Sequence, residues 1–159
     1  MAKMGASKRL QCVGITVPEI QKIVRAEFPN LKVGTYSVTS CPDKKYNCIA
    51  WAADDTSNFW WPIGGYWPDG VPRERTLDAF IKAFETKGYT VCDDVRYEEG
   101  FEKVAIYAKG DKPTHAARQI DISKWTSKLG PFADISHRLI GIEGNQYGKK
   151  VATLKRKKT

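Results

Sequence analysis

Cys48 follows Asn47 where a polar turn, residues 42–45, gives way to an apolar, alanine-rich stretch. This composition predicts that a short helix begins at or near Cys48. A thiol in the first turn of a helix faces unpaired N–H groups and the positive end of the helix dipole, which favour the nucleophilic thiolate. The amide of Asn47 could then donate to a developing oxyanion. The alternative is a buried cysteine on the apolar face of a core helix, because free cysteine is among the most buried residue types.

His115 is a candidate acid–base partner for such a thiol. It opens a predicted strand on which small neighbours, Ala117 among them, leave room for the imidazole. Ser127 lies on the next predicted strand and can pair roughly opposite His115 after a turn at residues 121–124. A polar side chain in that position would hold the imidazole in one tautomer. The order of the three residues therefore predicts a nucleophile, a base and an orienting group.

Other residues compete for roles at this site. Lys128 and Asp121 are alternatives to Ser127 as the third member, because a serine hydroxyl rotates and orients an imidazole weakly. Gln119 lies close to His115 in the sequence, and both Gln119 and Lys128 are candidates for binding substrate.

A metal site is a weaker hypothesis. Its ligands would be Cys41, Cys48, His115 and His137. No two of these residues have the close spacing of a zinc-binding pair, so neither a metal nor a cofactor is expected. The sequence assigns no role to His137 or Tyr147.

Residues 59–70 are dense in proline, glycine and aromatic side chains, which predicts an irregular loop, here called the aromatic loop. Its rings could fold back and cap the core. They could also form a wall of the substrate site, because aromatic rings stack on sugars and bases. The second interpretation assigns substrate binding to Trp60, Trp61, Tyr66 and Trp67.

Apolar spacing and turn residues indicate the elements that must position these side chains. Thr16 and Glu19 form a predicted capping box at the start of a helix that ends near Phe28. A second helix is predicted over residues 77–84 and is closed by Gly88. Strands are predicted at residues 33–39, 89–92, 101–108, 114–120, 125–129 and 151–154, and a short helix at 134–137. The strands between residues 101 and 129 predict an antiparallel meander, and hence an α+β domain.

The length of 159 residues suits a single domain. We expect a flexible tail at residues 1–14, the domain at 15–155 and a basic tail at 156–159. The formal net charge of +8 suits an anionic partner such as nucleic acid. The positive charges are concentrated at the two ends, so a solvated terminal run is the simpler interpretation.

The four cysteines show no CxxC motif and no framework spacing, so reduced thiols and a cytoplasmic location are expected. No apolar run is long enough to span a bilayer, and no apolar segment of a secretory signal is visible.

The cysteine–histidine–polar order resembles that of the papain-like fold, and most closely its compact bacterial branch, the NlpC-type cell-wall peptidases and amidases. This resemblance covers Cys48 to about Leu129. It implies an α+β fold in which a helix-borne cysteine packs on an antiparallel sheet of about four to six strands. It also implies that Cys48 attacks a carbonyl carbon, His115 acts as acid–base partner and Ser127 orients the imidazole, where relatives of that branch usually have His, Asn or Gln.

A wider resemblance, from roughly Phe28 to Leu154, is to an uncharacterised bacterial family of small proteins. It rests on the segments YNCIAWA, WWP…GGYWP, GFEKVA, THAARQ and WTSKLG. It implies no activity.

The sequence therefore predicts a cysteine hydrolase or acyl-transferase that acts on the amide bond of a peptide, small amide or cell-wall-like substrate. One alternative is a basic binding module for nucleic acid or another polyanion. Another is a papain-like scaffold that has lost activity and serves in a bacterial toxin or defence system.

Overall fold

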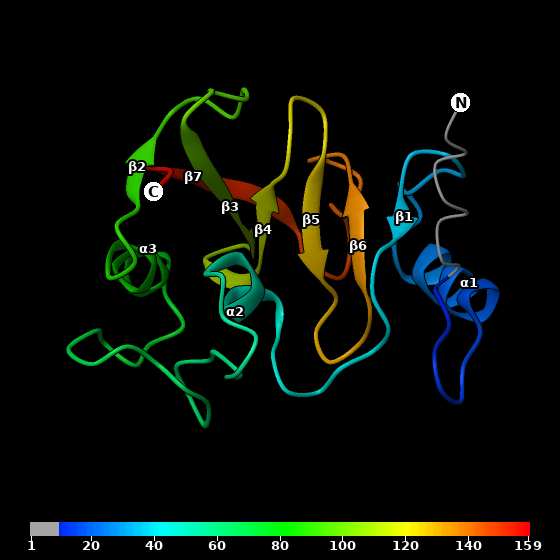
Figure 1. Ribbon diagram of the computed structural model, residues 1–159. Coiled ribbons are helices and arrows are strands. Elements are labelled where there is room, and N and C mark those ends of the chain that lie inside the picture. The colour runs from blue at the N-terminus through cyan, green and yellow to red at the C-terminus, as the bar shows by residue number, and fades with distance from the viewer. Residues whose placement is uncertain (1–9) are drawn as a thin grey trace.

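The computed structural model describes residues 10–159, and these form a seven-stranded antiparallel sheet with the strand order β1-β6-β5-β4-β3-β7-β2 (Figure 1). The strands are β1 (Ser37–Val38), β2 (Thr90–Cys92), β3 (Phe101–Lys109), β4 (Lys112–Gln119), β5 (Trp125–Lys128), β6 (Asp134–His137) and β7 (Lys149–Lys157). The predicted meander is confirmed as β3, β4 and β5, which are neighbours in the sheet.

Three helices accompany the sheet in the described part of the chain: α1 (Val17–Glu27), α2 (Cys48–Ala52) and α3 (Leu77–Glu85). Each begins after a polar side chain that accepts a hydrogen bond from a backbone N–H of the first turn, which satisfies a donor that has no partner inside the helix. These N-cap residues are Thr16, Asn47 and Thr76. Within residues 10–159, no helix has the length and apolar character that crossing a membrane requires.

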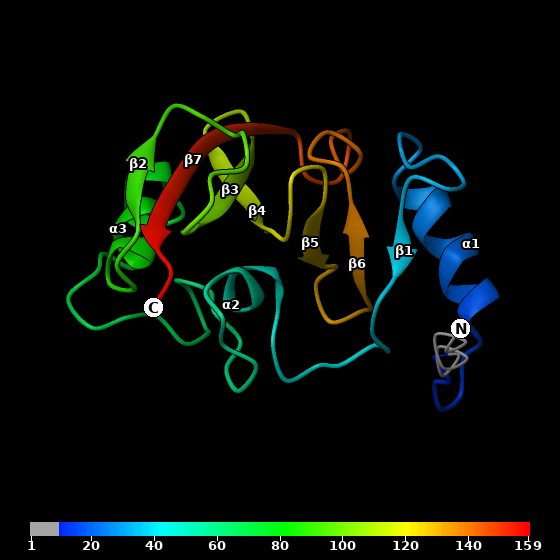
Figure 2. The ribbon, with the colours of Figure 1, turned by 45° about the horizontal axis from the view of Figure 1, so that its top comes forward.

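Two hydrophobic cores lie on opposite faces of the sheet. The ribbon views show α1 beside β1 at one end of the sheet and α3 beside β2 toward the other (Figures 1 and 2). Residues of β3 alternate between the faces: Val104 and Ile106 pack with α2, α3 and the aromatic loop, whereas Ala105 and Tyr107 pack with α1. We call these the α2 face and the α1 face. Because β3 lies inside the sheet, all four side chains are buried. Alternate residues of β3 therefore belong to two different cores, one on each face, and no face of this strand is exposed to solvent.

The expected papain-like α+β fold is wrong. The chain is mainly a β-rich, antiparallel seven-stranded sheet, and its helices are short, with eleven residues in α1, five in α2 and nine in α3. The predicted helix at residues 134–137 is also wrong, since this segment is strand β6. It pairs with β5 on one side and β1 on the other, and pairing on both sides outweighs any local preference of four residues.

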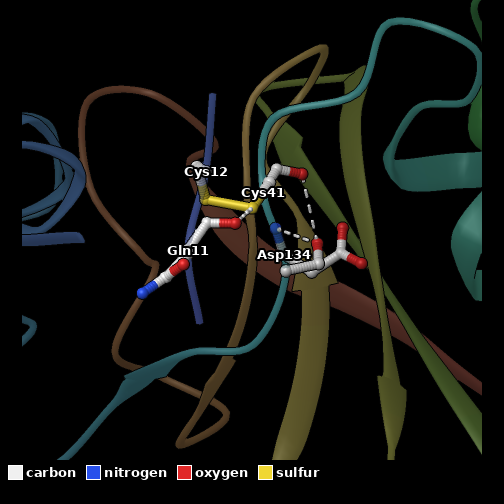
Figure 3. Close-up of a disulfide and its surroundings, with 5 residues drawn as sticks. Gln11, Cys12, Cys41 and Asp134 are labelled. Atoms are coloured by element: carbon white, nitrogen blue, oxygen red, sulfur yellow. Dashed lines mark hydrogen bonds between the residues drawn. A yellow bond between two sulfur atoms is a disulfide. The ribbon is translucent and has the colours of Figure 1, made fainter. Parts of the chain in front are cut away.

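A disulfide joins Cys12 to Cys41, 29 residues apart in the sequence (Figure 3). The expectation of four reduced thiols is therefore wrong for this pair, and Cys48 and Cys92 are the free cysteines. The bond ties the segment before α1 to the segment that leads into α2. Of the expected flexible tail at residues 1–14, residues 1–9 lie outside the described part of the chain, and Cys12 is covalently anchored.

We expect the double substitution Cys12→Ser with Cys41→Ser to lower the free energy of unfolding by about 2–4 kcal/mol, because an open chain gains entropy when it unfolds. Urea unfolding of the oxidised protein and of the variant measures this difference. Cys92→Ser is the matched control and should change stability by less than about 0.5 kcal/mol. Equal stability of the oxidised protein and the double variant would contradict a structural role for the bond.

Candidate functional site

The pairing between the central strands β4 and β5 stops early. Only Arg118 pairs with Thr126 and Gln119 with Trp125, whereas β5 continues to pair with β6 as far as Lys128. Beyond Arg118 and Thr126 the two strands are no longer joined by a backbone ladder. This β4–β5 opening is where the candidate catalytic side chains gather.

A chain of buried hydrogen bonds bridges the opening. His115 Nε2 lies 2.8 Å from Ser127 Oγ, which lies 2.6 Å from His137 Nε2. The other ring nitrogen of His137, Nδ1, lies 2.7 Å from the carbonyl oxygen of Arg138. The two histidines and the serine are each less than 2% exposed. The predicted pairing of His115 with Ser127 is therefore present, and His137 extends it.

The carbonyl at one end determines the direction of every proton in this chain. A carbonyl oxygen only accepts, so His137 Nδ1 carries the proton and His137 Nε2 is a bare acceptor. The single hydroxyl proton of Ser127 must then point to His137 Nε2. Ser127 Oγ can only accept from the other side, so His115 donates through Nε2–H. His115 Nδ1 is left as an unprotonated acceptor, and it is buried without a hydrogen-bond partner.

Burial keeps both imidazoles neutral. It lowers the pKa of His137 from 6.5 to about 4. It also lowers the pKa of His115 well below its ordinary value, and the nearby His137 adds to the effect because two imidazolium ions would repel each other. Tyr147 stacks on the His115 ring at 3.9 Å between ring centroids, and Tyr107 lies 5.6 Å away on the next strand. These rings surround His115 with apolar surface, which disfavours the imidazolium ion.

Cys48 is the first residue of α2, as predicted, but it is not a thiolate. Burial raises the pKa of its thiol from 9.0 to about 11, and the backbone N–H of Ala116 opposes that rise in part. The expectation that the helix start would ionise Cys48 is therefore wrong. Five residues make a weak helix dipole, and desolvation in the core outweighs it.

Cys48 and His115 approach β4 from opposite sides. Cys48 packs with Ala116 on the α2 face, whereas His115 pairs with Tyr107, which belongs to the α1 face. Ala116 follows His115 directly in the strand, so the thiol and the imidazole flank neighbouring residues of β4 beside the opening. The structure thus joins His115, Ser127 and His137 by direct bonds, and places Cys48 across the strand from them.

Both polar atoms of the Asn47 amide make hydrogen bonds within the fold, and of its donors only the second N–H of Nδ2 stays available. Its Oδ1 accepts from the backbone N–H groups of Ala50, at 3.3 Å, and Trp60, at 2.9 Å. Its Nδ2 donates to the carbonyl oxygen of Trp60 at 2.7 Å. Asn47 therefore caps α2 and ties the aromatic loop to it, and the predicted oxyanion role is not supported by its contacts.

The aromatic loop mainly completes the core of the α2 face. Trp60 and Trp67 are buried, and their indole N–H groups donate to Asp55 Oδ2 and to the carbonyl oxygen of Pro72. Tyr66 is 43% exposed, and Trp61 is half-buried beneath the guanidinium of Arg75. The sequence suggested that these rings form one wall of a substrate site. The indole N–H groups of Trp60 and Trp67, however, are already bonded within the core.

Three other predicted site residues also have structural partners. Lys128 is buried, and its ammonium group donates to three backbone carbonyl oxygens at 2.6–2.8 Å. Gln119 donates to the carbonyl oxygen of Val95 at 2.8 Å. Asp121 accepts from the backbone N–H groups of Ser123 and Lys124 and so shapes the turn before β5. None of the three shares a hydrogen bond with His115.

Part of the basic charge at the C-terminal end is neutralised within the fold. Lys155 pairs with Glu98 at 3.0 Å and Arg156 with Glu102 at 2.6 Å. Arg156 belongs to β7, although the sequence suggested a basic tail from this residue onward. The basic residues before Leu10 lie outside the described part of the chain. Polyanion binding therefore stays a prediction.

Sequence reasoning left His137 and Tyr147 without a role. The signal for His137 was available: the chain has only two histidines, and this one follows Ser127 by ten residues. The predicted helix at residues 134–137 hid it, because only a strand paired with β5 brings His137 next to Ser127. For Tyr147, which lies in a glycine-rich loop, we find no sequence signal. The described residues contain no group of three or more potential metal ligands.

We expect the free energy of unfolding to fall as the pH is lowered from 7 to 5. An unfolded His137 takes up a proton near pH 6.5, whereas the folded one does so only near pH 4, so protonation favours unfolding in this window. His137 should contribute about 2 kcal/mol, and His115 acts in the same direction. Urea unfolding at several pH values measures this loss. His137→Gln should show a shallower dependence, and an equal slope in the variant would contradict a buried, neutral His137.

We expect Asn47→Ala to lower the free energy of unfolding by about 2–4 kcal/mol, because it removes a helix cap and leaves two polar groups of Trp60 unpaired in the core. Chemical denaturation measures this. Asn30→Ala is the control, since Asn30 makes a single exposed bond to the carbonyl oxygen of Glu143 and should cost less than about 1 kcal/mol. Similar losses in the two variants would contradict the role assigned to Asn47.

Comparison with known proteins identifies a family and no activity. The family model described as a domain of unknown function, DUF7689, matches residues 37–155. This range runs from β1 into β7 and includes α2, the β4–β5 opening and all members of the hydrogen-bond chain. No curated protein and no solved structure matches the chain. The chain belongs to the DUF7689 family.

Proposed function

We propose that the protein is a cysteine hydrolase or acyl-transferase that acts on an amide or peptide bond, with Cys48 as nucleophile and His115 as general base. The observation that carries this proposal is the bare, unpartnered Nδ1 of His115 beside the β4–β5 opening. A buried polar atom without a partner costs about 1–3 kcal/mol. Such a cost is typical of atoms that a reaction uses, because their partner arrives with the substrate or the proton.

The protonation states favour a general-base mechanism over a preformed ion pair. The thiol pKa of about 11 keeps Cys48 protonated near neutral pH, and burial keeps His115 unprotonated. A neutral thiol is a poor nucleophile, so its proton must leave as the sulfur attacks. His115 Nδ1 is an available acceptor, since the Nε2 side of the ring is already committed to Ser127.

The proposed reaction has two balanced steps. Cys48 and His115 lie on opposite sides of β4, so the first step requires a movement at the β4–β5 opening that brings Sγ within hydrogen-bond reach of Nδ1. Cys48 then gives its proton to His115 Nδ1 while the sulfur bonds to the carbonyl carbon, and the same proton passes to the nitrogen of the leaving amine as the carbon–nitrogen bond breaks. This leaves a thioester on Cys48. In the second step His115 takes a proton from water, or from an acceptor amine, whose oxygen or nitrogen attacks the thioester and releases the thiol with its proton restored.

Access to His115 is governed by Tyr147. Its ring covers His115 and also forms one wall of a cavity of about 280 Å³, lined mainly by apolar side chains of α1 and of the turn between β5 and β6. The lining residues are Ile23, Val24, Glu27, Leu129, Gly130, Pro131, Phe132 and Tyr147. An apolar group of the substrate fits this cavity, and displacement of Tyr147 would open a way to the imidazole. The buried rings of Trp60 and Trp67 are not part of this proposal.

We expect p-nitrophenyl acetate to acetylate Cys48, because its small acyl group needs little space and its leaving group needs no protonation. Peptide mapping by mass spectrometry identifies the acetylated residue, and released nitrophenolate gives the rate. His115→Gln should slow acetylation of Cys48 about 10²–10³-fold, the usual contribution of a general base.

Two variants serve as controls for this experiment. Cys48→Ala should abolish the labelled peptide, and Cys92→Ser should leave the rate unchanged because Cys92 is the other free cysteine. Acetylation of Cys92 ahead of Cys48, or equal rates in the wild type and His115→Gln, would overturn the proposal.

A further inference from the structure

We propose that His137 is a positioning residue that, through Ser127, holds His115 in the Nε2–H tautomer and keeps its Nδ1 free of a proton. The use of that bare nitrogen in catalysis rests on the proposed function. The tautomer itself does not, because it follows from the hydrogen bonds alone.

The series of hydrogen bonds starts at the carbonyl oxygen of Arg138, which two donors hold in place. The carbonyl oxygen of Arg138 accepts from His137 Nδ1–H at 2.7 Å and from the backbone N–H of Gly141 at 3.0 Å. Strand β6 ends at His137, so the Arg138 carbonyl is free of the ladder and can turn toward the ring. Because a carbonyl cannot donate, this bond is compatible only with the Nδ1–H form of neutral His137.

Ser127 alone could not select a tautomer of His115. A hydroxyl both donates and accepts, so it bonds equally well to an imidazole Nε2 that carries a proton and to one that does not. With His137 Nε2 as an acceptor 2.6 Å away, the hydroxyl proton of Ser127 is already engaged. Ser127 Oγ then presents only lone pairs to His115. A serine can thus orient a catalytic base in the way that an amide or carboxylate does, provided that a second acceptor binds the proton of its hydroxyl.

The consequence is that the two histidines must be in opposite tautomers. His115 carries its proton on Nε2 and His137 carries its proton on Nδ1. If His137 is replaced by an apolar residue, the Ser127 hydroxyl is free to donate to His115 Nε2 as well as to accept from it, and the proton of His115 is no longer held on Nε2. A residue that merely packs against its neighbours would not change the tautomer of a ring on another strand.

Nuclear magnetic resonance of the full chain with labelled histidine tests this directly, since nitrogen and ring-carbon shifts distinguish the two neutral tautomers. The chain has only two histidines, so His137→Gln and His137→Leu assign both rings. In the wild type we expect His115 as Nε2–H and His137 as Nδ1–H. In His137→Leu the ratio of Nδ1–H to Nε2–H at His115 should rise about tenfold or more, as the loss of one oriented hydrogen bond predicts.

His137→Gln is the matched rescue, because its amide oxygen can replace Nε2 as the acceptor and should restore the Nε2–H form of His115. The proposal is overturned if the wild-type protein shows His115 as Nδ1–H, or if a folded His137→Leu keeps the wild-type ratio. Should His137→Leu fail to fold, the wild-type tautomers and the Gln variant still decide the question. If the two histidines show opposite tautomers but Cys48 is not acetylated, the inference about His137 stands and the proposed hydrolase is refuted. The two experiments can therefore fail independently of each other.

Discussion

The early end of the ladder between β4 and β5 is the constraint on which the candidate site depends. Buried backbone groups need partners, and a sheet normally supplies them from the next strand. Here the ladder stops after Arg118 and Thr126, and side chains bridge the gap in its place. The hydrogen bonds through Ser127 join β4 to β5 and β6, while the first residue of α2 lies beside Ala116 on the other face. One local defect in the sheet therefore brings a thiol, two imidazoles and a hydroxyl into the same region.

Burial determines how these groups can act. Removal from water disfavours each charged form, so Cys48 stays a thiol and both histidines stay neutral. In such a site the direction of hydrogen bonds matters more than charge. The Arg138 carbonyl orients His137, which orients the Ser127 hydroxyl, which orients His115. The same desolvation that makes the imidazole a weak base also keeps its Nδ1 free of competing water, and it makes the fold sensitive to acid.

Several residues that the sequence indicated as functional instead stabilise the fold. Asn47, Trp60 and Lys128 have the polar atoms that a binding site would need, but nearly all of those atoms are bonded within the core. A sequence shows that a residue can donate or accept, yet it does not show whether a neighbour has already used that capacity. The converse holds for His137, whose role became visible only when β6 proved to be a strand between β1 and β5.

The sequence by itself determined what depends on residues close along the chain. It located the cap at Thr16, the start of α2 at Cys48, the end of α3 near Gly88 and the meander, and it paired His115 with Ser127. Only the tertiary structure decided the seven-stranded order, the disulfide, the neutral state of Cys48 and the tautomer of His115. The physical reason is range: a cap is satisfied within one helical turn, whereas strand pairing and the burial that shifts a pKa depend on segments far apart in the sequence.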